Sequence, residues 1–366
     1  MRFFIVSGYG YWGNIDPEEL LAGERQVGGG ETAMLNISKE LAALGHEVVL
    51  FYDVARFGKF SGVDYLPLSM YIPMACNMDH DVLVSWDAPF ALRYNDRATK
   101  RVLAIQLNDA FIGPFDWTID YYFHPSRWHA QRFWGLYPEM TRDKSFWGLT
   151  NGIDYGRYVE LDNVPRNSKR VIYSSSPDRG LHHLLRIWPR VALEVPEAEL
   201  HVFYDAQKWL DNDAQVVAAG GTTVTSERAA AIREYLKRPP RSVYFHGGVG
   251  QSVLAIEQMK SGIMAYPCDP VRPTEGFSMS VLEGITAGCE VITTDADALN
   301  ELWASAPGVT ILPLPFDDEV WASTLISKLR NGGPADRIRV RSDLTWTALA
   351  RRWEQILDDG DLHTTH

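Results

Sequence analysis

The segment Glu275-Gly276-Phe277-Ser278-Met279-Ser280-Val281-Leu282-Glu283 places two carboxylates eight positions apart, around a loop and the start of a helix that runs to Gly288. We expect Glu275 to lie in the loop and Glu283 about two turns into the helix. Both carboxylates would then flank a ligand whose phosphate rests on the N–H groups of the helix N-terminus. Two ordinary surface glutamates are the alternative, but the apolar neighbours on both sides argue against free exposure.

Alternating strands and helices surround this segment. In the first half, strands are predicted at 2–7, 47–52, 82–85, 101–105 and 121–123, and a helix at 31–44. In the second half, strands are predicted at 170–174, 199–204, 242–245, 262–266 and 290–293, and a helix at 180–192. This alternation is typical of parallel sheets that helices cover on both faces. The predicted fold class is therefore α/β, with two doubly wound, Rossmann-like domains that face each other across a cleft.

Composition narrows the range of partners. The 366 residues suggest about two domains, and the polar stretch 160–169 is the natural linker. A net charge of −12 argues against nucleic acid or an anionic membrane as partner. We find no secretory signal and no apolar run long enough to be an integral membrane segment. Three widely spaced cysteines, Cys76, Cys268 and Cys289, fit reduced thiols, and we expect a cytoplasmic protein.

A glycine motif near the N-terminus suggests a different function. Gly8-Tyr9-Gly10-Tyr11-Trp12-Gly13 follows a strand and has the spacing of a dinucleotide-binding fingerprint, which would favour a dehydrogenase. A dinucleotide site needs a helix that begins at the third glycine, and Asn14-Ile15-Asp16-Pro17 interrupts it here. The acidic residue Asp53 also lies at about twice the usual separation. We therefore reject the dehydrogenase hypothesis.

Two further loops resemble anion-binding turns. Gly28-Gly29-Gly30-Glu31 precedes the first clear helix, where backbone N–H groups are free to approach a ligand. A mobile loop explains this segment equally well. Ser174-Ser175-Ser176-Pro177-Asp178-Arg179-Gly180 joins a strand to a helix, and Arg179 offers a forked cation for phosphate oxygens. The alternative is a serine-capped helix start with a solvent-facing arginine.

The order of these segments resembles a known family. Glu275 to Glu283 looks like the E-x7-E motif of retaining glycosyltransferases of the GT-B fold, particularly glycosyltransferase family 4. Further segments are similar to that family in the same order: Gly28 to Leu41, Gly45-His46-Glu47-Val48, Asn151-Gly152-Ile153-Asp154, Val171 to Pro189, Gly284 to Val291 with Glu301, and Trp346 to Ile356. The resemblance spans nearly the whole chain.

The resemblance implies a division of labour between the domains. The N-terminal domain, 1–158, would bind the acceptor, and a C-terminal helix at about 345–360 would cross back to join it. The C-terminal domain, 169–344, would bind the nucleotide-sugar donor. The implied activity is transfer of a hexosyl or related group from a UDP- or GDP-sugar to a saccharide or glycan, with retention of configuration. The resemblance implies no cofactor and no metal, and it leaves the base, the donor sugar and the acceptor open.

The resemblance also implies a set of site residues. Glu275 would bind hydroxyls of the donor sugar, Glu283 the ribose hydroxyls, and Arg179 the charge of the leaving group. The catalytic set is Glu275, Arg179 and Asp87. The donor-binding set is Gly29, Gly30, Ser174, Ser175, Ser176, Arg179, Gly247, Glu275, Gly276, Phe277, Ser278, Met279, Ser280 and Glu283. We interpret Asp211-Asn212-Asp213 and Asp295-Ala296-Asp297 as structural or loop residues rather than metal ligands.

The chain departs from the family pattern at three places. Tyr173 stands where the family usually has an arginine, so the phosphate site has one cation fewer. Trp86-Asp87 replaces a histidine, and Asp87 is the polar group left to act there. Ser278 replaces a frequent glycine.

Two other functions stay open. One is a non-catalytic sugar-nucleotide-binding protein. The other is a sugar-nucleotide epimerase, for which His124, His182, His183 and His246 are available. In the first domain, Trp117, Trp128, Trp134 and Trp147 fit glycan stacking and core packing equally well.

Overall fold

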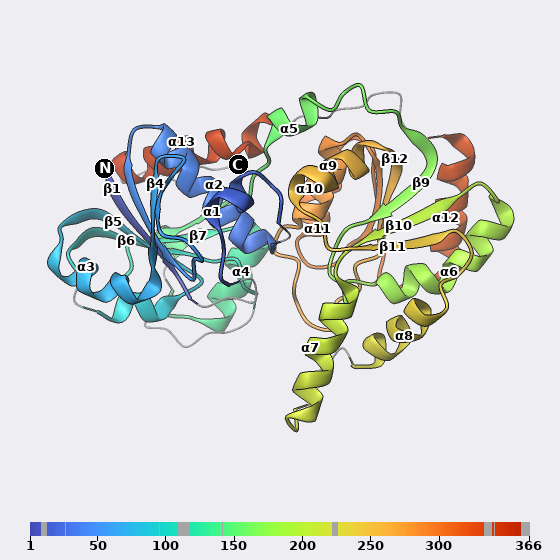
Figure 1. The fold of residues 1–366 in the computed structure, drawn as a ribbon, viewed down its shortest axis with the longest axis horizontal. Helices are drawn as coiled ribbons and strands as arrows, with labels where there is room; N and C mark the ends of the chain where they lie inside the picture. The colour runs from blue at the N-terminus through green and yellow to red at the C-terminus, as the bar shows by residue number, and fades with distance from the viewer. Residues whose placement is uncertain are drawn as a thin grey trace. The chain divides into compact units, whose positions relative to one another are not determined.

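The structure is a computed structural model that describes residues 1–8, 13–25, 27–94, 96–108, 118–140, 142–221, 226–332, 339 and 341–359. Most of the glycine motif Gly8–Gly13 lies outside these residues, and so does Trp117. The chain divides into two units, Met1–Asp154 with Arg341–His366, and Tyr155–Val340 (Figure 1). Each unit is an α/β domain built on one sheet.

The described part of the first unit has an eight-stranded sheet with the order β3-β4-β2-β1-β5-β6-β7-β8. All neighbouring strands are parallel except β3 and β4. The strands are β1 Arg2–Ser7, β2 Glu47–Tyr52, β3 Gly58–Phe60, β4 Val63–Pro67, β5 His80–Trp86, β6 Ala98–Ala104, β7 Tyr121–His124 and β8 Ser145–Trp147. The helices are α1 Pro17–Leu21, α2 Gly29–Ala43, α3 Tyr71–Asn77, α4 Arg127–Leu136 and α13 Trp346–Asp359, with 3-10 turns η1 Leu68–Met70, η2 Pro89–Arg93, η3 Arg142–Lys144 and η4 Ser342–Leu344.

The second unit has a six-stranded, wholly parallel sheet over its described residues, with the order β11-β10-β9-β12-β13-β14. The strands are β9 Asn167–Tyr173, β10 Glu199–Phe203, β11 Val243–Gly247, β12 Ser261–Tyr266, β13 Glu290–Thr294 and β14 Val309–Leu312. The helices are α5 Tyr155–Val159, α6 Leu181–Glu194, α7 Ala206–Ala218, α8 Ser226–Lys237, α9 Gln251–Met259, α10 Met279–Thr286, α11 Leu299–Trp303 and α12 Asp318–Asn331. Right-handed crossovers in this strand order place α6 and α12 on one face and α9, α10 and α11 on the other (Figure 1).

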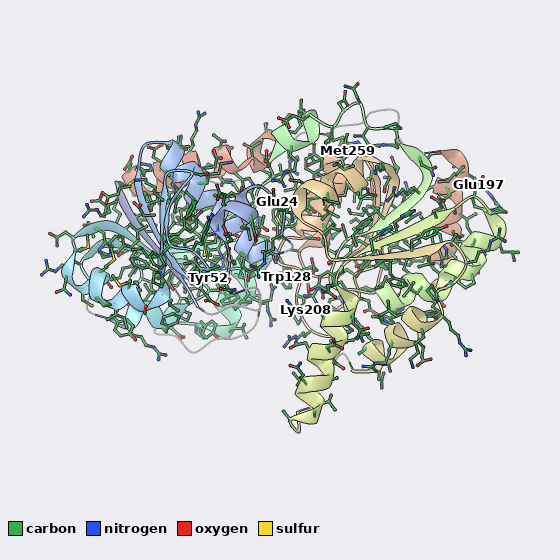
Figure 2. The ribbon with its side chains drawn as sticks, in the orientation of Figure 1. Glu24, Tyr52, Trp128, Glu197, Lys208 and Met259 are labelled. Carbon is green, nitrogen blue, oxygen red and sulfur yellow. The ribbon has the colours of Figure 1, made fainter. Side chains whose placement is uncertain are left out.

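Burial explains why these segments form strands. Phe3 to Val6 in β1 have no exposed surface, and all six residues of β12 are buried. A parallel strand with helices on both faces reads as a continuous apolar run, which is the pattern that these segments show. Tyr52 and Met259 point into the two cores, whereas Glu197 lies at the surface (Figure 2).

The fold class agrees with the sequence-based prediction, and the differences are local. Predicted strands are found with ends shifted by up to three residues, and the short strands β3, β4, β8 and β14 were not predicted. Asp211, Asn212 and Asp213, which we interpret from the sequence as structural or loop residues, lie in the helix α7. The Asp205 carboxylate accepts a hydrogen bond from the Lys208 amide at 2.9 Å and caps this helix, and Leu210 is buried beneath it.

The last helix packs on the first unit. Trp353 Nε1 of α13 donates to the Leu149 carbonyl at 2.8 Å, and Thr347 Oγ1 donates to the Glu40 carboxylate of α2 at 2.7 Å. Conversely, α5 belongs to the second unit, because the Tyr158 hydroxyl donates to Gln258 Oε1 at 2.7 Å. The N-terminal segment of the first unit therefore ends at Asp154, and the boundary predicted from the sequence is at 158. No helix in the described ranges is both long and apolar enough to cross a bilayer.

Candidate functional site

Two loops meet at one edge of the second sheet. The loop 174–180 follows β9, and the loop 267–278 follows β12, which is the neighbour of β9. The carboxyl ends of adjacent parallel strands lie at the same edge, where such sheets bind ligands. Ser280 Oγ, in the first turn of the helix α10 that follows the second loop, donates to the Ser174 carbonyl of the first loop at 2.9 Å. The structure thus brings together the two segments that the sequence marked separately.

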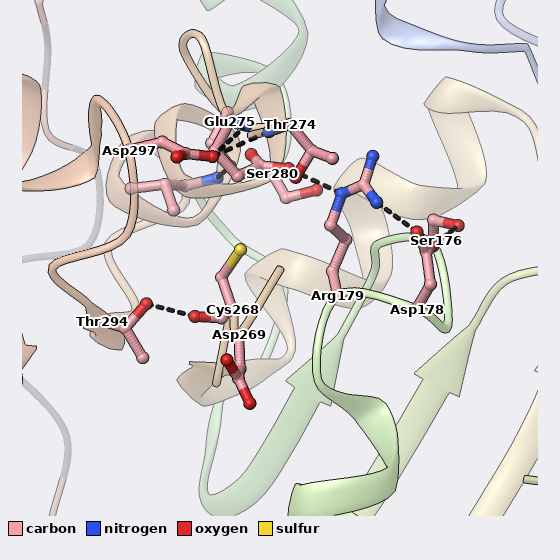
Figure 3. A network of polar contacts seen from close by, with 12 residues as sticks. Ser176, Asp178, Arg179, Cys268, Asp269, Thr274, Glu275, Ser280, Thr294 and Asp297 are labelled. Carbon is pink, nitrogen blue, oxygen red and sulfur yellow. Dashed lines mark hydrogen bonds and ion pairs between the residues drawn. The ribbon is translucent and has the colours of Figure 1, made fainter. Parts of the chain in front are cut away.

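Arg179 lies between two carboxylates (Figure 3). Its Nε donates to Glu275 Oε1 at 2.9 Å, and its Nη1 is paired with Asp178 Oδ2. The Arg179 side chain is 21% exposed, and Glu275 is 9% exposed. Burial acts to lower the pKa of Arg179, but the charges of Asp178 and Glu275 outweigh it and raise that pKa above its ordinary value. The guanidinium is therefore a permanent cation that two anions already neutralise.

The backbone of Glu275 is fixed by the loop after β13. Asp297 Oδ2 accepts hydrogen bonds from the amides of Thr274 and Glu275, at 2.7 and 2.9 Å, and the Ala298 amide donates to the Glu275 carbonyl at 3.1 Å. Asp295 Oδ1 accepts from the Leu314 amide at 2.9 Å. Both aspartates thus hold backbone, in agreement with their interpretation as loop residues. The described residues include no group of three or more His, Cys, Asp or Glu side chains arranged to hold a metal ion.

The start of α10 offers unused N–H groups. Ser278 is the N-cap, and its Oγ accepts from the Val281 amide at 3.4 Å. Within the part of the chain that the structure describes, the amides of Met279 and Ser280 have no acceptor. Ser278 adopts a φ of 78°, a conformation that glycine tolerates better than serine. This helix start can therefore bind an anion through two amides.

Phe277 does not contribute its side chain to this surface. Its ring packs edge-on against Trp303 at 5.2 Å between centroids, and its carbonyl accepts from Trp303 Nε1 at 2.9 Å. Phe277 was placed in the donor-binding set for its backbone amide, and the packing of its ring in the core leaves that prediction untouched. Its backbone stays in the predicted loop.

Glu283 lies about one turn into α10, not two, because the helix begins only at Met279. It is 4% exposed, and Gln258 Nε2 donates to its Oε2 at 2.9 Å. Gln258 in turn accepts from the Tyr158 hydroxyl, so a chain of hydrogen bonds orients the carboxylate. Burial raises the pKa of Glu283.

The loop after β9 depends on Tyr173 and Gly180. The Tyr173 ring is fully buried, and its hydroxyl donates to the Ser176 carbonyl at 2.7 Å. Tyr173 therefore supports the loop and places no cation at the site. Gly180 has a φ of 91°, and a Cβ there would lie 1.8 Å from the Pro267 carbonyl oxygen. Only glycine lets the two loops pass this closely.

The other predicted glycines have open surroundings. Gly29 is the first residue of α2, and neither Gly30 nor Gly247 has a heavy atom within 4 Å of a built Cβ. The protein's own packing therefore does not require glycine at Gly30, which leaves room for a ligand to approach the backbone. Gly247 has a φ of 76°, which glycine adopts without strain.

Asp87 lies in a partly buried turn at the end of β5. Its Oδ1 accepts from the amides of Gln106 and Leu107 at 2.7 and 3.1 Å, and its φ is 50°. Burial raises the pKa of Asp87 to about 7, with a smaller contribution from the charge of Glu31, and the two backbone hydrogen bonds oppose this rise. Burial also raises the pKa of Glu31. Two carboxyl groups that hold protons more tightly than usual thus lie near each other in the first unit.

Two of the aromatic candidates of the first unit, Trp134 and Trp147, pack against each other and are half-buried. Trp86 stacks on Trp353 at 6.2 Å. Trp134 lies edge-on to Trp147 at 6.5 Å, and its Nε1 donates to Ser145 Oγ at 3.0 Å. Trp128 is half-buried on α4.

The candidate histidines have structural partners. His124 lies 3.0 Å from His129 between ring nitrogens, and His129 Nε2 lies 2.9 Å from the Leu107 carbonyl oxygen. His183 is paired with Asp269 at 2.7 Å. His246 stacks on Phe203, and His182 lies against His183. None of these hydrogen bonds, ion pairs or ring contacts reaches Arg179 or Glu275 among the described residues.

From the sequence alone, no role in the site was assigned to three residues that shape it: Asp178, Arg228 and Asp297. Arg228 on α8 donates from Nη1 to the Asp178 carbonyl at 2.8 Å and to the Asp269 carbonyl, so it joins both loops from below. Asp178 lies inside the segment Ser174 to Gly180, and the adjacent Arg179 is the sequence feature that could have pointed to an ion pair there. Arg228 had no local signal, because only the tertiary fold brings α8 beneath the loops.

Known proteins share this architecture. Residues 169–331, which carry the site, match the family "Glycosyl transferases group 1". A curated relative, phosphatidyl-myo-inositol mannosyltransferase of Mycolicibacterium smegmatis (strain ATCC 700084 / mc(2)155), is 22% identical over 189 residues. That match covers 50% of this chain and 42% of the relative, so it spans less than half of the relative's length.

Solved structures match over nearly the whole chain. AviGT4, a glycosyltransferase involved in avilamycin A biosynthesis, superposes with a TM-score of 0.66 at 15% identity, over 97% of this chain and 96% of AviGT4. HepE of Anabaena, solved in complex with UDP, gives a TM-score of 0.57 at 12% identity, over 96% and 94%. At these identities the likeness establishes the fold. The chain thus has the GT-B fold, and its residues 169–331 match the glycosyl transferases group 1 family.

Proposed function

We propose that this protein transfers a sugar from a nucleoside diphosphate donor to a saccharide or glycan acceptor, with retention of anomeric configuration, as enzymes of glycosyltransferase family 4 do. One observation carries the proposal. Arg179 and Glu275 meet at 2.9 Å on an edge where Ser280 of α10 donates to the Ser174 carbonyl and where, among the described residues, the Met279 and Ser280 amides have no acceptor. A cation, a carboxylate and free N–H groups together suit a diphosphate linked to a polyhydroxyl group.

Each group has a proposed role. The amides of Met279 and Ser280 and the guanidinium of Arg179 would hold the diphosphate and stabilise the charge that develops as it leaves. Glu275 would accept hydrogen bonds from hydroxyls of the donor sugar, and Glu283 would accept them from the ribose. In the first unit, Asp87 is the proposed catalytic polar group, and Gly29 and Gly30 would approach the donor through their backbone.

Retention follows when the acceptor attacks the face that the diphosphate vacates. The bond from the anomeric carbon to the phosphate oxygen breaks, and the bond to the acceptor oxygen forms on the same side. A departing phosphate oxygen takes the acceptor proton. We propose that N–H groups and Arg179 stabilise the leaving group without a metal, so transfer should persist in EDTA.

The similar proteins suggest candidates for the base and the sugar of the donor. UDP is bound in the Anabaena structure, and the curated relative is named as a mannosyltransferase. We therefore propose a UDP- or GDP-hexose as donor.

The three cysteines form no disulfide among the described residues, which supports the cytoplasmic location proposed from their spacing.

The test is donor-dependent release of nucleoside diphosphate. The purified protein is incubated with each common UDP- and GDP-sugar, with and without a panel of saccharide acceptors, and release is measured for the wild type and Glu275→Ala. We expect one donor to give release, and the Glu275→Ala rate to fall by about 10²-fold or more, because a transition-state contact is lost. Glu319→Gln, on an exposed carboxylate of the same unit, is the matched control.

The opposite results favour the other functions. Thermal shifts that reveal nucleotide binding without release on any acceptor would indicate a non-catalytic binding protein. Conversion of the donor sugar without an acceptor would indicate an epimerase.

A further inference from the structure

In this structure the cation of the site, Arg179, forms an ion pair with Glu275, the carboxylate proposed to bind the donor sugar. Arg179 Nε donates to Glu275 Oε1, and Arg179 Nη1 is paired with Asp178 (Figure 3). One positive and two negative charges leave the group with a net charge of −1. A diphosphate carries more negative charge still, so this arrangement opposes its binding as long as Glu275 keeps Arg179.

Tyr173 makes this opposition sharper. Its side chain is buried, and its hydroxyl is used by the Ser176 carbonyl, so it adds no charge to the diphosphate loop. Arg228 lies beneath the loop, where its Nη1 is committed to two carbonyl oxygens. Arg179 is thus the cation that the loop 174–180 itself offers to a phosphate.

The two carboxylates differ in how firmly they are held. Asp178 is the neighbour of Arg179 in the chain; its other oxygen accepts from Ser176 Oγ, and its carbonyl accepts from Arg228. The Glu275 side chain reaches Arg179 from the other loop, and Arg179 is its hydrogen-bond partner among the described side chains. Among the described residues, moving the Glu275 carboxylate therefore breaks one side-chain hydrogen bond, to Arg179, whereas moving the Asp178 carboxylate would break its bonds to both Arg179 and Ser176.

We propose that the donor diphosphate takes Arg179 away from Glu275, and that this exchange frees the Glu275 carboxylate for the hydroxyls of the donor sugar. Asp178 stays on Arg179 as a positioning residue that keeps the guanidinium at the loop. The inference rests on the proposed function and adds an order of events to it. The diphosphate binds first, and Glu275 binds the hydroxyls of the sugar only afterwards. Free sugars, which bring no phosphate, meet a carboxylate that is already paired.

The first test measures nucleotide affinity. Glu275→Gln keeps the size of the side chain and removes its charge, so the barrier to taking Arg179 falls. We expect the variant to bind UDP or GDP about tenfold more tightly than the wild type by calorimetry, which corresponds to about 1.4 kcal/mol. Transfer falls at the same time, because the neutral amide grips the sugar less well. Glu319→Gln removes one exposed charge from the same unit and should leave the affinity unchanged.

The outcomes separate this inference from the proposed function. If the wild type binds neither UDP nor GDP, the proposed function fails, and this inference fails with it. If the wild type binds a nucleotide and Glu275→Gln binds it equally or more weakly, the inference alone is overturned.

A second measurement uses only the wild type, in case the variant does not fold. Saturation-transfer NMR should detect a free monosaccharide matching the donor sugar only when UDP or GDP is present. Equal sugar signals with and without the nucleotide would overturn the proposed order.

Discussion

Burial of the Asp87 carboxyl predicts that its removal stabilises the protein in a pH-dependent way. Asp87→Asn keeps an oxygen that can accept from the Gln106 and Leu107 amides, which lie at 2.7 and 3.1 Å. It removes the ionisable group whose pKa burial raises from 3.8 to about 7. The variant therefore isolates the cost of a charge in this turn.

The magnitude follows from the shift. A rise of roughly three units in the pKa of Asp87 corresponds to a free-energy cost of about 4 kcal/mol for the charged carboxylate, at about 1.4 kcal/mol for each unit. Asp87 keeps some exposed surface, and relaxation and water reduce that figure, so we expect about 1–3 kcal/mol.

The sign comes from proton linkage. Below pH 3.8 the carboxyl is protonated in both the folded and the unfolded chain, and there is no penalty. Between 3.8 and about 7 the unfolded chain loses the proton first, so the wild-type stability falls as the pH rises. Above about 7 the full cost is present. The Asp87→Asn variant carries no charge at this position, so its stability does not include this cost.

The assay is urea unfolding of wild type and variant at pH 4 and pH 8, with a probe in the first unit. Asp87→Asn should be more stable than the wild type at pH 8 by about 1–3 kcal/mol and nearly equal to it at pH 4. Asp81→Asn is the matched control, because its exposed carboxylate also accepts a backbone N–H, from Arg2 at 2.6 Å. A variant that is destabilised equally at both pH values would refute the reasoning, since the hydrogen bonds would then outweigh the charge.

Two further substitutions probe the loops of the second unit. Gly180→Ala puts a Cβ 1.8 Å from the Pro267 carbonyl oxygen and should cost about 3 kcal/mol and weaken nucleotide binding, measured by urea unfolding and calorimetry. Gly220→Ala, at a φ of 81° with no heavy atom within 4 Å, should show only the smaller backbone cost; equal losses would mean that the overlap is relieved cheaply. Ser278→Gly should relieve strain at a φ of 78° and raise stability by about 0.5–1 kcal/mol, because the weak cap to Val281 is worth only a few tenths. A net loss in the melting temperature would show that the cap matters more than the strain.

The sequence alone determined the fold class. The buried strands β1, β2 and β12 read as continuous apolar runs, because helices cover both faces of a parallel sheet. Polar and glycine residues after the strands β9 and β12 also located both loops of the candidate site. These signals are local, since they depend on burial and on backbone conformation within a few residues.

The partners within the site required the tertiary structure. Nothing in the sequence pairs Arg179 with Glu275, places Arg228 under both loops, or makes Asp297 the support of the Glu275 backbone. The sequence also does not show that the Phe277 ring packs against Trp303, because these residues lie in different elements. Hydrogen bonds and ion pairs act over about 3 Å between segments far apart in the chain, so they are fixed only when adjacent strands bring their loops to one edge of the sheet.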